Sequence, residues 1–151
     1  EWDVTYQPGK LVAIGYKNGK KVKTEVVETT GQATAIALSA DRDMIKADNA
    51  DVAVVTVALK DKKGRVVPTA CHQLTLHLDG DMRILGVGNG DPACKDAERP
   101  TDANAKDFTV KAFNGYARIF LQSGKKTGEN TLSVTADGMK EKRIFISCEG
   151  N

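Results

Sequence analysis

The amino-acid sequence predicts an all-β fold, an antiparallel β-sandwich. Along several short segments, apolar and polar residues alternate with a period of two, which is the spacing of a strand that buries only one of its faces. Turn-forming residues separate these segments at intervals of about 8–12 residues, as in sandwiches and barrels. No segment combines apolar residues three and four positions apart with a helix cap at each end, so no helix is predicted.

The first predicted strands lie before residue 30. They are Trp2–Tyr6, Leu11–Tyr16 and Val22–Val27. The pair Asn18-Gly19 between the last two marks a hairpin turn, and the polar segment Glu28–Gln32 is interpreted as a hinge. Because about three strands cannot close a sandwich, we interpret residues 1–30 as the closing strands of a preceding immunoglobulin-like domain plus this hinge.

The remaining residues, 31–151, are predicted to form one complete immunoglobulin-like β-sandwich of about seven or eight strands. The segment Val52–Leu59 is almost continuously apolar and β-branched, which favours a central strand covered on both faces. The segments that alternate strictly are Gln73–Asp79, Tyr116–Gln122, Thr131–Ala136 and Arg143–Cys148. Their predicted core residues are Leu74, Leu76, Leu78, Ala117, Ile119, Leu121, Leu132, Val134, Ala136, Ile144, Ile146 and Cys148.

Composition and charge argue against several classes of function. The chain has 22 basic and 20 acidic residues, and its net charge of +2 gives no electrostatic footprint for nucleic acid or an anionic membrane. No apolar run approaches the ~20 residues that a membrane-spanning helix needs. The chain begins with Glu-Trp-Asp, without an initiator Met or a signal peptide, so we expect it to be a fragment of a longer protein.

Several short segments of the chain resemble a known family, in the family's own order. Trp2–Tyr16 is similar to the closing strands of the immunoglobulin-like domain that follows the catalytic barrel in bacterial β-galactosidases of glycoside hydrolase family 2. Later segments resemble the next C-terminal domain of those enzymes, and the most specific are Gly86-Val-Gly-Asn-Gly-Asp-Pro92 and Lys111-Ala-Phe-Asn-Gly115. The others are Ala40–Asp43, Ile45–Asp48, Val66–Pro68 and Leu121–Ser123.

The resemblance implies that the chain is a non-catalytic C-terminal accessory domain of a multidomain bacterial enzyme acting on β-galactosides or related sugars. The acid/base and nucleophile glutamates of such an enzyme would lie in the barrel, so no catalytic residue is carried over to this chain. The resemblance also implies a periplasmic or extracellular location. The segment between Pro92 and Lys111 is longer than the usual family pattern and contains Cys94.

The residues themselves give no indication of catalysis, a cofactor or a metal. Retaining glycosidases need two carboxyl groups about 5–5.5 Å apart. The most closely spaced acids, Asp79/Asp81 and Asp41/Asp43, lie at predicted turns or strand starts, where solvated acids are expected. The segment that begins at Asp41 also lacks the ligand at position five and the glycine at position six of a calcium loop.

Cysteine and histidine add no catalytic pair. Cys71 and His72 are predicted neighbours on a strand, so their side chains would point to opposite faces. His77 is predicted on the polar face of its strand. The three cysteines, which include Cys94 and Cys148, leave open either one disulfide with a free thiol or three free thiols.

Three functions remain as hypotheses. The leading one is structural: the domain packs on other domains of the parent enzyme, and residues 88–107, which lack apolar periodicity, reach a neighbouring domain or the rim of the active site. The alternatives are a carbohydrate-binding module for oligosaccharides and a bacterial adhesin-type repeat. We also expect that a second copy of the chain can pair with it through the strands of residues 1–28 to form a homodimer. The candidate interdomain or sugar contacts are Asn89, Asp91, Tyr116, Phe120 and Trp2.

Overall fold

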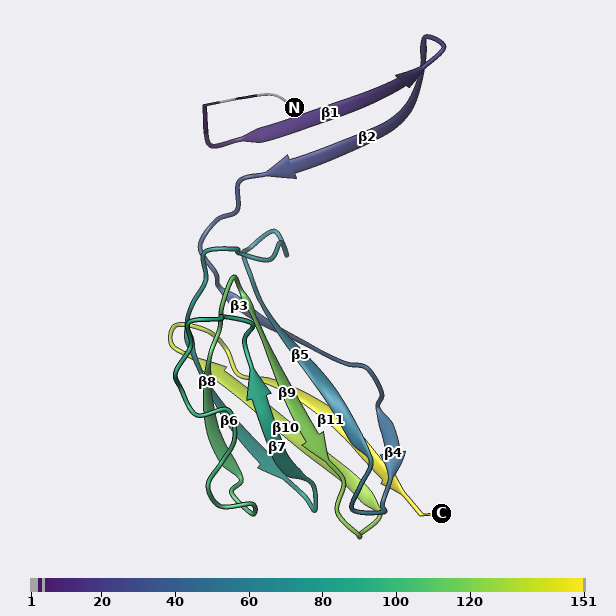
Figure 1. The fold of residues 1–151 in the computed structure, drawn as a ribbon, viewed down its shortest axis with the longest axis vertical. Coiled ribbons are helices and arrows are strands. Elements are labelled where there is room, and N and C mark those ends of the chain that lie inside the picture. The colour runs from purple at the N-terminus through teal and green to yellow at the C-terminus, as the bar shows by residue number, and fades with distance from the viewer. Residues whose placement is uncertain (1–2, 4, 151) are drawn as a thin grey trace. The chain divides into compact units, whose positions relative to one another are not determined.

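The computed structural model describes residues 3 and 5–150, and this part of the chain contains only strands, bridges, turns and loops (Figure 1). None of these residues belongs to a helix that is long and apolar enough to cross a membrane. Contacts between residues divide the chain into two compact units, Glu1–Gly31 and Gln32–Asn151. In the described part of the chain, no sheet combines strands of both units.

The first unit contains a two-stranded antiparallel sheet of β1 (Lys10–Lys17) and β2 (Lys20–Glu28). Asn18 and Gly19 connect the two strands with φ angles of 51° and 75°. Positive φ at both central residues is the requirement of the type I′ turn, whose twist matches that of a hairpin. The two strands predicted on either side of this turn are therefore confirmed.

The prediction of a strand at Trp2–Tyr6 is wrong for those of its residues that the structure describes. Asp3, Thr5 and Tyr6 form no strand. A strand needs a partner for its backbone groups, and no strand of this unit pairs with these residues. Trp2 lies outside the described residues.

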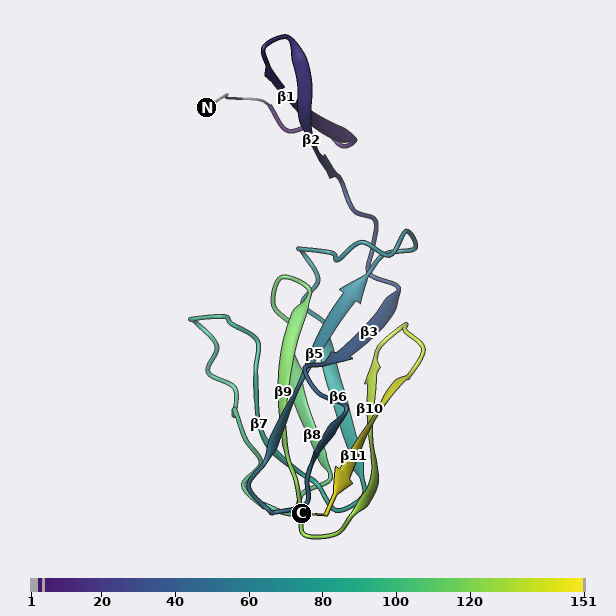
Figure 2. The same ribbon diagram turned by 90° about the vertical axis from the view of Figure 1, so that its right-hand side faces the viewer.

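The second unit is an immunoglobulin-like sandwich of two sheets (Figures 1 and 2). The strand order is β4-β11-β10-β6-β8 in one sheet and β3-β5-β9-β7 in the other. Neighbouring strands are antiparallel except for the parallel pair β4 and β11. The bounds are β3 (Ala35–Ala40), β4 (Met44–Lys46), β5 (Val52–Lys60), β6 (Gln73–Asp79), β7 (Arg83–Gly88), β8 (Asp107–Lys111), β9 (Tyr116–Gln122), β10 (Gly128–Ala136) and β11 (Lys142–Glu149).

The predicted core residues line the interior between the two sheets. Ten of the twelve have at most 2% of their surface exposed, which confirms the predicted inward face of each strand. The other two, Ala136 and Ile144, are partly buried and pack against the core near the ends of their strands. The second unit has more strands than expected because the three-residue β4 is too short to show alternation.

Strand β5 occupies the predicted central position, between β3 and β9. Its inward residues Ala53, Val55, Val57 and Leu59 are completely buried. Its outward residues are only half-buried, so the prediction that both faces are covered is wrong. Within this unit no second layer lies over the outer face of the four-stranded sheet, and apolar outward residues on β5 therefore stay partly accessible.

A buried amide side chain joins the β6–β7 turn to the other strands of the five-stranded sheet. Asn130 on β10 is 3% exposed. Its Oδ1 accepts hydrogen bonds from the backbone N–H groups of Asp81 at 2.7 Å and Met82 at 3.0 Å, and its Nδ2 donates to the carbonyl oxygen of Ile146 at 3.3 Å. Gly80 has no room for a Cβ atom because Asn130 lies against it. This one side chain therefore satisfies buried backbone groups of the turn and of β11.

Replacing Asn130 with alanine is expected to lower the free energy of unfolding by about 1–3 kcal/mol, because two amide groups then lose their acceptor. Chemical denaturation followed by circular dichroism measures the change. Asn104→Ala is the matched control: this residue is exposed in the β7–β8 loop, and its truncation should change stability by less than about 0.5 kcal/mol. Equal stability of the two variants would contradict this role of Asn130.

Candidate functional site

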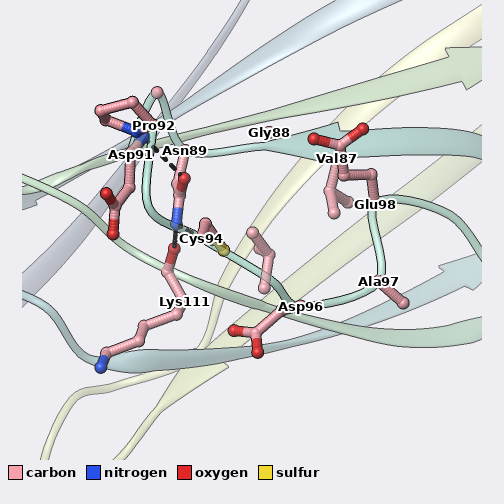
Figure 3. A pocket seen from close by; sticks show the side chains of 12 residues that line it. Val87, Gly88, Asn89, Asp91, Pro92, Cys94, Asp96, Ala97, Glu98 and Lys111 are labelled. Carbon is pink, nitrogen blue, oxygen red and sulfur yellow. Dashed lines mark hydrogen bonds between the residues drawn. The ribbon is translucent and has the colours of Figure 1, made fainter.

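The loop between β7 and β8 is the irregular segment that the sequence predicts, and its first turn is built on two polar side chains (Figure 3). Asn89 Nδ2 donates to the carbonyl oxygen of Lys111 at 2.9 Å, and Asn89 Oδ1 accepts from the backbone N–H of Asp91 at 2.9 Å. Asp91 Oδ1 then accepts from the N–H of Ala93 at 2.9 Å. Asn89 thus connects the start of the loop to the end of β8, and Asp91 shapes the turn that follows.

The rest of the loop is also attached to the sandwich. The carbonyl oxygen of Glu98 accepts a hydrogen bond from the N–H of Val87 at 2.7 Å, so the loop covers part of the β7 edge. The carbonyl oxygen of Lys106 accepts from the N–H of Leu78 at 2.8 Å. Lys106 Nζ donates to two carbonyl oxygens of the β6–β7 turn, each at 2.8 Å. The loop is therefore held in place at its start, its middle and its end.

A pocket of about 280 Å³ lies between this loop and the strand ends (Figure 3). Its polar lining residues are Asn89, Asp91, Asp96, Glu98 and Lys111, and Cys94 also borders it. Both polar atoms of the Asn89 amide are already used inside the protein. No three His, Cys, Asp or Glu side chains come together to hold a metal ion anywhere in residues 3 and 5–150.

A second, larger depression of about 490 Å³ lies on the outer face of β9. Tyr116, Arg118 and Phe120 line it together with Thr56 of β5, and Asn89 forms part of its border. Three of the predicted contact residues, Asn89, Tyr116 and Phe120, therefore meet in one place. Asp91 instead lines the loop pocket, and Trp2 lies outside the described residues.

Arg118 is a lining residue that the sequence analysis missed. It lies between Tyr116 and Phe120 on the outward side of β9. The residues that alternate with these three along the strand are all buried, which shows that the three face outward. The period-two pattern that placed the two aromatic rings on one face also places Arg118 between them. The signal was thus present in the sequence.

Two of the predicted turn acids, Asp81 and Asp41, accept hydrogen bonds from backbone groups. Asp81 Oδ2 accepts from the N–H groups of Lys125 at 2.8 Å and Lys126 at 2.9 Å, and these bonds hold the pKa of Asp81 below its usual value. Asp41 Oδ1 accepts from the N–H of Val54 at 2.7 Å. The lowered pKa of Asp81 suits a structural role rather than that of a proton donor.

Residues Cys71 and His72 are not strand neighbours, contrary to the prediction. Ladder pairing of β6 with β8 begins at Gln73, and both residues lie in the preceding loop. His72 Nδ1 is buried and has no hydrogen-bond partner. All three cysteines are free thiols, and burial raises the pKa of the Cys148 thiol.

His77 lies on the outward, polar side of β6 as predicted. Its Nδ1 is 2.7 Å from Asp107 Oδ1, and its Nε2 is 3.3 Å from Asp79 Oδ1. The hydrogen bond to Asp107 is the main reason why the pKa of His77 is raised above 6.5. This cluster is on the five-stranded sheet, whereas Tyr116, Arg118 and Phe120 are on the other sheet.

Comparisons with known proteins identify the family. Residues 36–145 match the family described as Glycoside hydrolase family 2 C-terminal domain 5, and this match covers more than half of the chain. The chain belongs to this family. Residues 1–23 match a second family, described as Domain of unknown function (DUF4982). The resemblance to C-terminal domains of family 2 glycoside hydrolases is thereby confirmed.

Two curated relatives of this glycoside hydrolase family 2 domain are much longer than the chain itself. Beta-galactosidase BoGH2A of Bacteroides ovatus is 32% identical over 148 residues, which are 98% of this chain and 17% of that protein. The beta-galactosidase of Thermoanaerobacter pseudethanolicus is 26% identical over 149 residues, which are 99% of this chain and 16% of that protein. The chain thus spans less than a fifth of the curated relatives named here.

Solved structures of longer chains also contain a part that is similar to this chain. The crystal structure of a glycosyl hydrolase family 2 member from Bacteroides cellulosilyticus matches with a TM-score of 0.87 and 30% identity, over 98% of this chain and 18% of that one. The adhesin InvE of Yersinia pseudotuberculosis matches with a TM-score of 0.51 and 14% identity, over 95% of this chain and 40% of that one. At that identity the second likeness shows a shared fold alone.

Proposed function

We propose that the chain is a non-catalytic accessory domain of a family 2 glycoside hydrolase with β-galactosidase-like activity, and that it stabilises the parent enzyme by packing on its other domains. The observation that carries the proposal is the correspondence of almost the whole chain to 17% of beta-galactosidase BoGH2A. A β-sandwich that accounts for so small a part of a hydrolase leaves most of that protein to hold the reaction site.

The state of three acids at the turns of the sandwich suits a structural role. A retaining glycosidase needs one carboxylate and one carboxyl group whose pKa is raised enough to donate a proton. The pKa values of Asp48, Asp51 and Asp81 are instead lowered, chiefly by hydrogen bonds from backbone N–H groups. Acids in this condition hold turns together and do not deliver protons near neutral pH.

We further propose that residues 1–30 complete a preceding immunoglobulin-like domain of the parent. The hairpin carries apolar pairs on both of its faces: Leu11 lies opposite Val27 on one face, and Val12 lies opposite Val26 on the other. All four are exposed, by 60%, 68%, 45% and 44%. A two-stranded sheet is marginally stable on its own in water, so these surfaces need cover. The separate family match of residues 1–23 supports this division.

The attached loop between β7 and β8 is proposed as a contact of this domain with the rest of the parent. Its hydrogen bonds to Val87, Leu78 and Lys111 fix its course before any partner arrives. A preformed loop loses little conformational entropy on binding. It therefore suits a permanent interface with a neighbouring domain or with the rim of the active site.

Removing residues 32–151 from the parent enzyme tests the accessory role. We expect the melting temperature of the parent to fall by several degrees, while kcat per folded active site stays within about tenfold, because the reacting groups remain. A variant in which residues 93–104 alone are replaced by a short glycine linker should reproduce part of this loss. Loss of all turnover in a truncated enzyme that is still folded, or unchanged stability of both variants, would contradict the proposal.

Hydrogen exchange of residues 10–28 tests the proposed place of the hairpin. We expect fast exchange in the isolated chain and strong protection in the parent enzyme, where a neighbouring domain covers both faces. Equal exchange in the two proteins would contradict the assignment. Protection of the isolated chain that grows with protein concentration would instead show a homodimer through these strands.

A further inference from the structure

The outer face of the four-stranded sheet presents an aromatic ring, a guanidinium group and a second aromatic ring in a row. Tyr116, Arg118 and Phe120 alternate with Ala117, Ile119 and Leu121 along β9, and the last three are at most 1% exposed. At a rise of about 3.3 Å per residue, successive outward side chains stand roughly 7 Å apart. The strand positions that carry the two rings are therefore about 13 Å apart, with the position of Arg118 midway between them.

Open space lies beside Arg118, in the middle of this row, because its neighbours across the sheet are small. In the strand register, Thr56 on one side and Gly88 on the other lie opposite Arg118. Phe120 lies between Val54 and Gly86, and the Glu98 carbonyl oxygen of the loop lies close to Gly86. A Cβ atom added at Gly88 would meet nothing within 4 Å. The depression of about 490 Å³ along these residues is this unfilled space.

The charge of this sheet has one sign. Its strands β3, β5, β7 and β9 contain Lys60, Arg83 and Arg118 and no acidic residue. Arg83 donates to the neutral side chain of Gln122, so its charge is not neutralised. The five-stranded sheet, in contrast, contains both acidic and basic residues.

Arg118 differs from the arginines that stabilise this fold. Arg65 is bound to Asp61, and Arg42 to Asp51. Within residues 3 and 5–150, no hydrogen bond or ion pair engages the Arg118 side chain. A guanidinium group stays charged near neutral pH and matches a carboxylate with two parallel hydrogen bonds. Arg118 is therefore available to an anionic ligand.

We propose that this surface binds an acidic oligosaccharide, in which a uronate carboxylate pairs with Arg118 and sugar rings on either side stack on Tyr116 and Phe120. Aromatic faces pack against the apolar faces of sugar rings, and the cation supplies the preference for a charged sugar. A single sugar ring does not reach both aromatic rings, so the ligand has to be an oligomer. Asn89, which borders the depression, holds the start of the neighbouring loop through its hydrogen bond to Lys111.

Titration of the full chain with a hyaluronan tetrasaccharide, in which glucuronate alternates with a neutral amino sugar, tests this site. The carboxyl methyl ester of the same tetrasaccharide is the neutral control ligand. We expect the acid to bind, with backbone NMR shifts centred on β9, and the ester to bind at least about tenfold more weakly, because the charge-assisted hydrogen bonds are lost. Added salt should weaken binding of the acid.

Three variants separate the contributions. Arg118→Gln should lower affinity for the acid by about tenfold or more, and Tyr116→Ala should weaken acid and ester alike. Arg143→Gln, on the other sheet, should leave affinity unchanged, and thermal unfolding of each variant checks that it is folded. Equal affinity for acid and ester, or no binding of the acid at 10 mM concentrations, would overturn the proposal. Neither outcome would affect the accessory role, which does not depend on this site.

Discussion

Burial of one face of each sheet against the other is the constraint on which the rest of this structure depends. Leucine, isoleucine and valine side chains from β5, β6, β9 and β10 fill the space between the sheets, and the largest of them are completely buried. Because each strand alternates, this requirement also decides which residues face outward. The outer faces and the loops are then free to carry contacts with other molecules.

Polar groups in the sandwich serve mainly to fix turns at the ends of the strands. Asp61 is 4% exposed, accepts backbone hydrogen bonds within its own turn and pairs with Arg65 at 2.6 Å. Asn130 and Asp81 fix the β6–β7 turn and the loop before β10. The partners of Asp61, Asn130 and Asp81 keep these turns rigid.

The sequence predicted the sandwich because apolar and polar residues alternate strictly in strands such as β6 and β9, where one face is buried and the other faces solvent. Prediction failed where pairing, rather than alternation, decides the structure. Cys71 and His72 continue the chain into β6 but precede its first ladder pair. The three-residue β4 is a strand only because β11 pairs with it. The free state of the thiols depends on distances that no sequence pattern contains.

The candidate contacts could be predicted only in part. Tyr116 and Phe120 were placed on one outward face because they alternate with buried residues along β9, and the same pattern includes Arg118. That Asn89 meets them, while Asp91 does not, depends on the course of the β7–β8 loop across the sandwich. Local sequence does not determine that course, because the hydrogen bonds that hold it connect residues far apart in the chain.

The central claim is that this domain supports a hydrolase without taking part in bond cleavage. The most direct measurement is turnover of a chromogenic aryl β-galactoside by the purified chain, with the intact parent enzyme measured alongside at the same molar concentration. We predict hydrolysis by the parent and only the background rate with the chain. Hydrolysis by the chain above background, retained through repeated purification and lost on its unfolding, would contradict the account.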